Sequence, residues 1–217
     1  MGGPAGAERV IATNILTLKY HGTHFYLLEA AGGKLLVDAG WPGSLATLAS
    51  KLKTYRLDGG QIKYAWPTHL HPDHAGLVQE VKQAWGTRLV IHAAQVAYLP
   101  DLAALFAKKG GYVPVQVEAG DTVLTDDNRR QLRALGIEGE IIATPGHSDD
   151  SFSLVLDSGE AFVGDLTLPQ LASEDAAPTV RASWQALVEH QAKVIYPGHA
   201  GPFGIEAIRE YLAADMP

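Results

Sequence analysis

The segment 69–74 reads His-Leu-His-Pro-Asp-His and follows directly on a short apolar stretch that predicts a β-strand. In an extended segment, residues two apart point to the same side, so His69 and His71 can converge on one point. Asp73 and His74 then lie where the chain turns into a predicted helix. Four such side chains within six residues indicate a metal site, because imidazole and carboxylate are ligands for zinc, iron, manganese and nickel.

Three further candidate ligands each follow a short apolar stretch later in the chain. They are His147 in Thr-Pro-Gly-His, Asp165 in Val-Gly-Asp and His199 in Tyr-Pro-Gly-His. Glycine allows a sharp exit from a strand, and functional residues collect on the loops where strands end. The repeated Pro-Gly-His tripeptide indicates that its two histidines have the same role.

Strand-like and helix-like patterns are mixed along the whole chain. We expect strands over 10–18, 23–30, 34–38, 62–66, 88–92, 140–144, 152–156, 161–163 and 194–196. We expect helices over 45–52, from the histidine-rich segment to about residue 85, and over 93–99, 101–108, 126–135, 179–191 and 205–213. This mixture predicts an α/β or α+β fold with sheets covered by helices. No linker divides the chain, so one domain is predicted over 9–217, with residues 1–8 disordered or foreign to the natural domain.

Composition and charge exclude several classes of protein. The 217 residues include no cysteine, which excludes disulfide scaffolds, iron–sulfur clusters and thiol nucleophiles. The net charge of −7 argues against general binding of nucleic acid or anionic membranes. No uncharged apolar run approaches the roughly 20 residues of a membrane helix, and the first residues lack the pattern of a signal peptide. We expect a cytoplasmic protein whose partner is a small-molecule substrate, without binding to nucleic acid or membranes. The sequence makes no prediction of the oligomeric state.

The order of the candidate residues resembles that of the metallo-β-lactamase-fold superfamily of metallohydrolases: Asp38, His69-X-His71-X-Asp73-His74, His147, Asp165 and His199. The resemblance covers nearly the whole chain from Val10, and the ligand set is similar to those of lactonases and glyoxalase-II enzymes. It implies a four-layer αββα sandwich with a two-metal site at one edge. It also implies the ligand sets: His69, His71 and His147 for one metal, and Asp73, His74 and His199 for the other, with Asp165 bridging. Asp38 is implied to hydrogen-bond a ligand histidine.

Such a site predicts hydrolysis. A single catalytic zinc already lowers the pKa of bound water to about 7, and two cations that share a water molecule acidify it strongly. The bridging hydroxide could then attack an ester, lactone or thioester of a small molecule. Asp73 is the candidate catalytic residue, because it can accept a hydrogen bond from the hydroxide and pass a proton to the leaving group. We expect two divalent ions, with zinc favoured over iron or manganese.

Departures from subfamily patterns leave alternatives open. Asp165 and the absence of cysteine disfavour β-lactam hydrolysis, so that a weak promiscuous β-lactamase is a secondary expectation. No glutathione pocket like that of glyoxalase-II enzymes is evident, and Leu168 stands where quorum-quenching lactonases have a tyrosine. A mononuclear iron enzyme resembling persulfide dioxygenases is the main alternative. A metal-dependent binding module without activity is the third.

Several residues on loops near the ligands are candidates to line a substrate pocket. They are Tyr20, His21, His24, Trp41, Phe106, Tyr112 and Leu168. Aromatic side chains beside a metal cleft favour an apolar or acyl-bearing substrate. By contrast, His92 and His190 are interpreted as structural or solvated.

Overall fold

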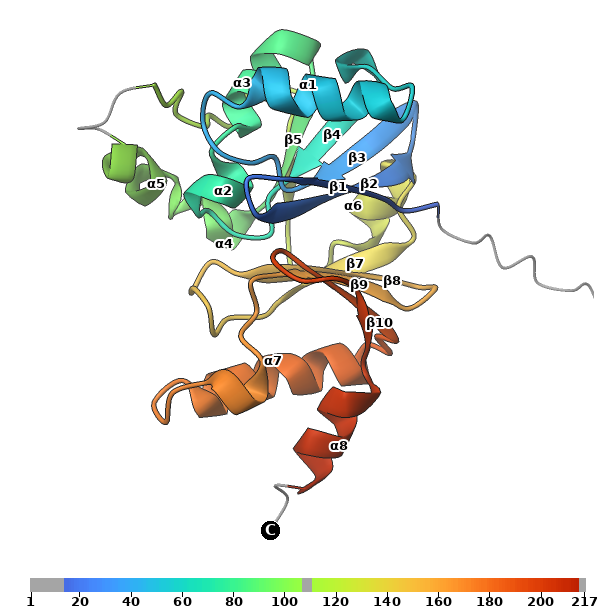
Figure 1. The fold of residues 1–217 in the computed structure, drawn as a ribbon, viewed down its shortest axis with the longest axis vertical. Coiled ribbons are helices and arrows are strands. Elements are labelled where there is room, and N and C mark those ends of the chain that lie inside the picture. The colour runs from blue at the N-terminus through green and yellow to red at the C-terminus, as the bar shows by residue number, and fades with distance from the viewer. Residues whose placement is uncertain (1–13, 107–110, 215–217) are drawn as a thin grey trace, which may run out of the picture.

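The computed structural model describes residues 14–106 and 111–214 of the chain (Figure 1). The predicted N-terminal segment 1–8, the start of the strand predicted from residue 10 and the last two residues of the helix predicted over 101–108 lie outside the described residues.

The described residues form two β-sheets. The first has the order β1-β2-β3-β4-β5-β6, with β1 (Leu16–Tyr20), β2 (Thr23–Ala30), β3 (Gly33–Val37), β4 (Ile62–Trp66), β5 (Arg88–His92) and β6 (Thr122–Leu124). The second has the order β11-β10-β9-β8-β7, with β7 (Gly139–Ala143), β8 (Phe152–Leu156), β9 (Glu160–Gly164), β10 (Val194–Pro197) and β11 (Phe203–Gly204). Hairpins join β1–β3 and β7–β9, whereas β3 to β6 run parallel.

Helices cover the outer faces of both sheets. The helices are α1 (Leu45–Thr54), α2 (Pro72–Ala75), α3 (Val78–Trp85), α4 (Ala93–Val96), α5 (Leu99–Phe106), α6 (Arg129–Ala134), α7 (Ala177–Glu189) and α8 (Glu206–Ala214). Figure 1 shows α1 and α3 over the first sheet, and α7 and α8 on the far side of the second. The predicted four-layer αββα sandwich is therefore confirmed. Within the described ranges, no helix combines the length and the apolar character that a membrane crossing requires.

Three apolar clusters hold the four layers together. Successive side chains of β2 point to opposite faces of the sheet, and both faces are covered. Phe25 and Leu27 pack in the cluster beneath α1 and α3, whereas Tyr26 and Leu28 pack in the cluster between the two sheets. A third cluster surrounds Trp184 of α7, between the second sheet and the last helices.

The strand directions bring the candidate ligands to one edge of the sandwich. β4 runs parallel to β3, and β10 runs parallel to β9, so the carboxyl ends of each pair lie together. Asp38 follows β3, the segment 67–74 follows β4, Asp165 follows β9 and His199 follows β10. The candidate site therefore lies at the edge where these strands end.

Some predicted elements were wrong in detail. The helix predicted to run unbroken to Trp85 is divided into α2 and α3 at Gly76, where a side chain would clash with Pro42 and with the carbonyl oxygen of Pro72. Pro100 was expected between two helices, but it lies in the first turn of α5, where a missing N–H costs nothing. The short strands β6 and β11 were not predicted.

We expect Leu154→Ala to destabilise the protein strongly. Leu154 of β8 is fully buried in the cluster between the sheets, so its truncation leaves a cavity and lowers the free energy of unfolding by about 2–5 kcal/mol. Leu171→Ala is the matched control, because Leu171 is 71% exposed, and it should change that free energy by less than about 0.5 kcal/mol. Urea unfolding of both variants checks this, and equal losses would contradict the assigned core.

Candidate metal centre

The histidine-rich segment changes from extended to helical conformation in its middle. His71 has extended dihedral angles and precedes α2, and Pro72 occupies the first helical position, where proline is favoured. The rings of His69 and His71 lie 4.6 Å apart, as expected for residues two apart in an extended segment. Asp73 and His74 lie in the first turn of α2 and so point to a second place.

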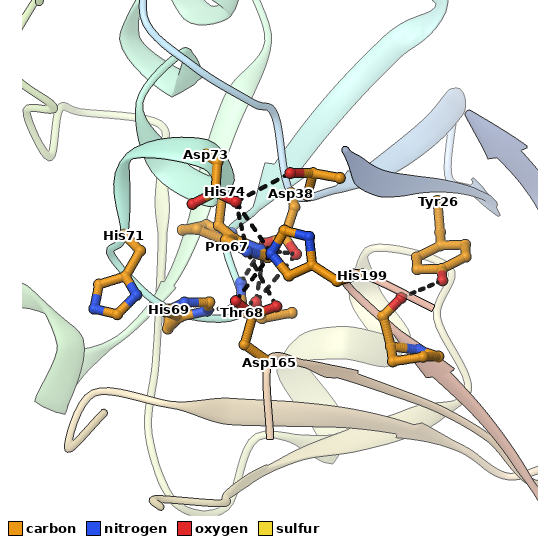
Figure 2. Close-up of polar contacts among 12 residues, drawn as sticks. Tyr26, Asp38, Pro67, Thr68, His69, His71, Asp73, His74, Asp165 and His199 are labelled. Atoms are coloured by element: carbon orange, nitrogen blue, oxygen red, sulfur yellow. Dashed lines mark hydrogen bonds and ion pairs between the residues drawn. The ribbon is translucent and has the colours of Figure 1, made fainter. Parts of the chain in front are cut away.

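The structure brings the seven candidate ligands into three overlapping groups. Figure 2 shows those of the histidine-rich segment together with Asp165 and His199. In each group, one ligand atom from each residue lies within 4.8 Å of the others. The groups are His69 with His71 and His147, His69 with His74 and Asp165, and Asp73 with His74 and His199. The first and last groups match the two ligand sets that the resemblance implies.

Asp165 lies between the two outer groups. Its Oδ2 atom is 3.1 Å from His199 Nε2 and 3.6 Å from His147 Nε2, while its Oδ1 atom is 3.2 Å from His74 Nε2. This close approach requires glycine at position 198, because a Cβ there would collide with Asp165 and His74. The carboxylate is thus placed where it can contact ions in both groups.

Three buried polar atoms in the centre make no hydrogen bond: His69 Nε2, His74 Nε2 and Asp165 Oδ1. Two of them, His74 Nε2 and Asp165 Oδ1, nevertheless lie 3.2 Å apart as an ion pair. Burial of an unpartnered polar atom is costly and rare in folded proteins. A cation coordinated by these atoms would remove that cost, and neutral imidazole with carboxylate is a donor set for zinc, iron or manganese. The residues present therefore fit a metal ion.

The ionisation of the centre follows from its burial and its neighbours. Burial, reinforced by the neighbouring histidines, lowers the pKa of His69 well below its usual value. Burial also opposes the charging of His74, but the carboxylates of Asp38, Asp165 and Asp73 outweigh it and raise the pKa of His74 well above its usual value. Burial raises the pKa of Asp73, but His74 and a threonine hydroxyl outweigh that effect and lower it overall. The neutral imidazole of His69 and the ionised carboxylates are ready to bind a cation, whereas binding at His74 must displace a proton.

Asp38 holds the ring of His74 in place. His74 Nδ1 donates to Asp38 Oδ2 (2.8 Å), and the backbone N–H of Thr68 donates to Asp38 Oδ1 (2.7 Å). Asp38 has a φ of +59°, a left-handed conformation that Asp and Asn tolerate better than most residues. Because Asp38 occupies Nδ1, the Nε2 atom of His74 is left to face the other ligands. The sequence implied a ligand histidine as its partner, and the structure identifies His74.

Thr23, at the start of β2, is a site residue that the sequence reasoning missed. Its Oγ1 atom donates to Asp73 Oδ2 (3.0 Å), across 50 positions of sequence. The same hairpin also holds the last ligand, because His199 Nδ1 donates to Gly22 O (3.1 Å). Tyr26 of β2 donates through Oη to Pro197 O (2.6 Å), just before His199 (Figure 2). No local pattern marks Thr23, since only the fold brings this hairpin to the centre.

Gln95 and Asp150 were also missed, and both support the histidine-rich segment from behind. The Nε2 atom of the fully buried Gln95 lies 3.2 Å from the carbonyl oxygens of Pro67, Thr68 and Asp150. Asp150 Oδ2 accepts the backbone N–H of Leu70 (2.6 Å). The segment that carries the first histidines is therefore fixed by side chains from α4 and from the loop before β8.

A cavity of about 320 Å³ adjoins the centre. Of the seven predicted pocket residues, only Leu168 lines it. Tyr20 is buried in the first core, where its Oη donates to Ala39 O (2.7 Å). Phe106 and Tyr112 stack on each other with ring centres 4.9 Å apart and pack against the same core.

Among the other predicted pocket residues, His24 lies beside a ligand loop, since its backbone N–H donates to Gly198 O (2.7 Å), next to His199. His24 is buried, whereas His21 and Trp41 are exposed, and none of the three lines the cavity. The prediction placed the pocket among N-terminal aromatic residues, but the apolar wall comes from the C-terminal half. His92 caps α4 by accepting the N–H of Ala94. His190 pairs with Glu140 (2.6 Å), consistent with a structural role.

We expect Asp38→Asn to weaken metal binding while preserving the fold. Asparagine tolerates the positive φ and retains an acceptor for Thr68, but it removes the negative charge that His74 contacts. The affinity for the ion held by the Asp73, His74 and His199 group should fall by about 10-fold to 100-fold. Competition with a chromophoric zinc chelator measures this, and circular dichroism checks folding. An unchanged affinity in a folded variant would show that Asp38 does not act through His74.

We expect Thr23→Val to lower the affinity for the same ion by about tenfold. Valine keeps the β-branched shape that suits a strand but removes the hydroxyl that donates to Asp73. The same chelator competition applies, with Thr17→Val on the neighbouring strand β1 as the control. Equal effects of both variants would assign the loss to the sheet rather than to the hydroxyl.

Comparison with known proteins agrees with this geometry. The chain is 26% identical over 184 residues to "Probable metallo-hydrolase YflN" of Bacillus subtilis, covering 76% of this chain and 67% of that protein. It is 29% identical over 214 residues to "Beta-lactamase-like protein 2 homolog" of Caenorhabditis elegans, covering 96% of this chain and 66% of that protein. The chain thus spans about two thirds of the length of these relatives.

A solved structure and a family model complete the comparison. The fold is similar to that of a metallo-beta-lactamase family protein from Thermus thermophilus, with a TM-score of 0.65 and 23% identity, covering 92% of this chain and 79% of that one. The model of the metallo-beta-lactamase superfamily matches residues 19–199, which include all seven candidate ligands and Asp38. On the extent of that match, the chain belongs to the metallo-β-lactamase superfamily.

Proposed function

We propose that the protein is a hydrolase that holds two divalent ions, zinc by preference, and acts on an ester, lactone or thioester of a small molecule. The observation that carries the proposal is the convergence of seven His and Asp side chains at one edge of the sandwich, where three buried polar atoms make no hydrogen bond. Membership of a superfamily of metallohydrolases supports the reaction class. Nucleic acid and membrane are not part of the proposal, and a cytoplasmic location stays a prediction.

The exposure of the ligands supports a site that is open to substrate on one side. His69 and His74 are buried, whereas the side chains of His147 and His199 are 29% and 49% exposed. When bound, the two cations would supply an acidified water as nucleophile and would stabilise negative charge on the substrate. The chain therefore needs no serine or cysteine nucleophile.

Asp73 is positioned to transfer a proton from the attacking water to the leaving group. Its carboxylate is ionised and partly exposed, and its Oδ2 atom already accepts a hydrogen bond from Thr23. It can accept a proton from the attacking water and return it to the leaving group, as a general base and then a general acid. Asp73 thus contributes both to the second ligand group and to proton transfer.

We expect His71→Ala and Asp73→Ala each to lower kcat/KM by at least about 100-fold, because each removes a ligand and Asp73→Ala also removes a proton acceptor. His190→Ala is the control, since His190 pairs with Glu140 outside the centre, and its rate should stay within about twofold. The measurement is steady-state hydrolysis of a panel of esters, lactones and thioesters by zinc-loaded protein. Full activity in both ligand variants would contradict the assignment.

Metal analysis of the protein as purified, before any metal is added, separates the alternatives. About two zinc ions per chain together with hydrolysis supports the proposal. About one iron per chain with oxygen uptake on a persulfide would instead support the mononuclear oxygenase. Full metal loading without turnover on esters, lactones, thioesters, phosphodiesters or β-lactams would leave a binding module.

A further inference from the structure

The cavity beside the metal centre has two chemically different ends. His147, Asp165 and His199 form the end that adjoins the candidate ligands. Leu166, Leu168, Trp184 and Phe203 contribute to the other walls. The volume is about 320 Å³, at the lower end of the range of small-molecule sites.

The apolar walls are fixed by contacts within the C-terminal half. Trp184 of α7 is fully buried, and its Nε1 atom donates to Thr167 O (2.7 Å). This hydrogen bond holds the loop that carries Leu166 and Leu168 directly after Asp165. The ring of Phe203 lies 6.3 Å from the ring of Trp184, centre to centre, so β11 supports the same cluster. The walls of the cavity are therefore fixed by packing and by a hydrogen bond, so that the cavity needs little rearrangement to accept a ligand.

The lining also restricts the kind of group that the cavity can bind. Among its lining residues, all within the described part of the chain, none is a lysine or an arginine that could pair with a phosphate or carboxylate. The indole N–H of Trp184 is already engaged by Thr167. Away from the ligand residues, the walls thus offer contact area and few hydrogen bonds, which favours an apolar group.

We propose that this cavity binds an apolar acyl group of the substrate, next to the bond that is hydrolysed, and that Leu168 limits the length of that group. The proposal rests on the hydrolase function proposed above, and it narrows the substrate class to acyl esters and thioesters with medium-length chains. The volume supports this size, since it is about twice the roughly 150 Å³ of an apolar cavity that admits benzene.

The first test is a series of N-acetylcysteamine thioesters with acetyl, butanoyl, hexanoyl and octanoyl groups, assayed with zinc-loaded protein. The leaving group stays constant, so kcat/KM should rise roughly threefold per added methylene until the cavity is full. Leu168→Trp should lower the octanoyl-to-acetyl ratio of kcat/KM at least about tenfold, because the indole occupies space that the chain requires. Leu168→Asn, which makes the same wall polar, should lower the ratio in the same direction.

Leu171→Trp is the matched control, because Leu171 follows on the same loop but is 71% exposed and does not line the cavity. It should leave the octanoyl-to-acetyl ratio unchanged. A flat chain-length series in active wild-type protein, or an unchanged ratio in the folded Leu168 variants, would overturn the acyl-binding role and leave the hydrolase function intact.

The second test does not depend on catalysis. Binding of 1-hexanol to metal-free protein is followed by ligand-observed NMR in the wild type and in the Leu168→Trp and Leu171→Trp variants. Loss of binding in Leu168→Trp alone supports an apolar site in this cavity, even if no substrate is turned over and the hydrolase function fails. Equal binding to all three proteins, or binding to none, would overturn the proposal.

Discussion

The packing of the two sheets on each other sets the position of every group in the metal centre. Trp66 ends β4 and Phe162 lies near the end of β9, and both are fully buried in the cluster between the sheets. Because the two sheets pack face to face through this cluster, the segments that follow β4 and β9 are held close together. His69 and Asp165 therefore meet at one edge, although almost a hundred residues of chain lie between them. The geometry of the ligands is thus a consequence of apolar packing, and a defect in that packing would reach the centre.

The polar groups at this edge lower the stability of the metal-free protein. Several imidazoles and carboxylates are crowded and buried, and three of their atoms make no hydrogen bond. Asp38 and Thr23 offset part of this cost by orienting His74 and Asp73, but they leave the inward-facing atoms free. A cation that binds the folded state and not the unfolded chain would stabilise the fold through mass action. Metal affinity and folding stability would then be linked.

Local patterns predicted the parts of the structure whose information is local. The strands 62–66, 88–92 and 152–156 lie where apolar β-rich runs placed them, and the ligand positions followed from motifs at strand ends. The support from Thr23 and Gln95 could not be predicted, because these side chains reach the centre only through contacts between distant segments. Most of the residues that line the cavity beside the centre could not be predicted for the same reason. Tyr20 is an aromatic residue near a ligand loop, but its alternation within β1 points it into the core.

The candidate ligands and the apolar walls of the cavity come from partly different segments of the chain. The N-terminal half supplies four of the ligands together with Asp38 and Thr23, whereas the apolar cavity is built by the loop after β9, by α7 and by β11. Leu168 and Phe203 form no part of the ligand groups and lie in a cluster separate from the core beneath α1 and α3. Changes at these positions would alter the space beside the centre without removing a candidate ligand. On the function proposed above, these positions are where selectivity can vary, because they line the cavity and belong to none of the ligand groups.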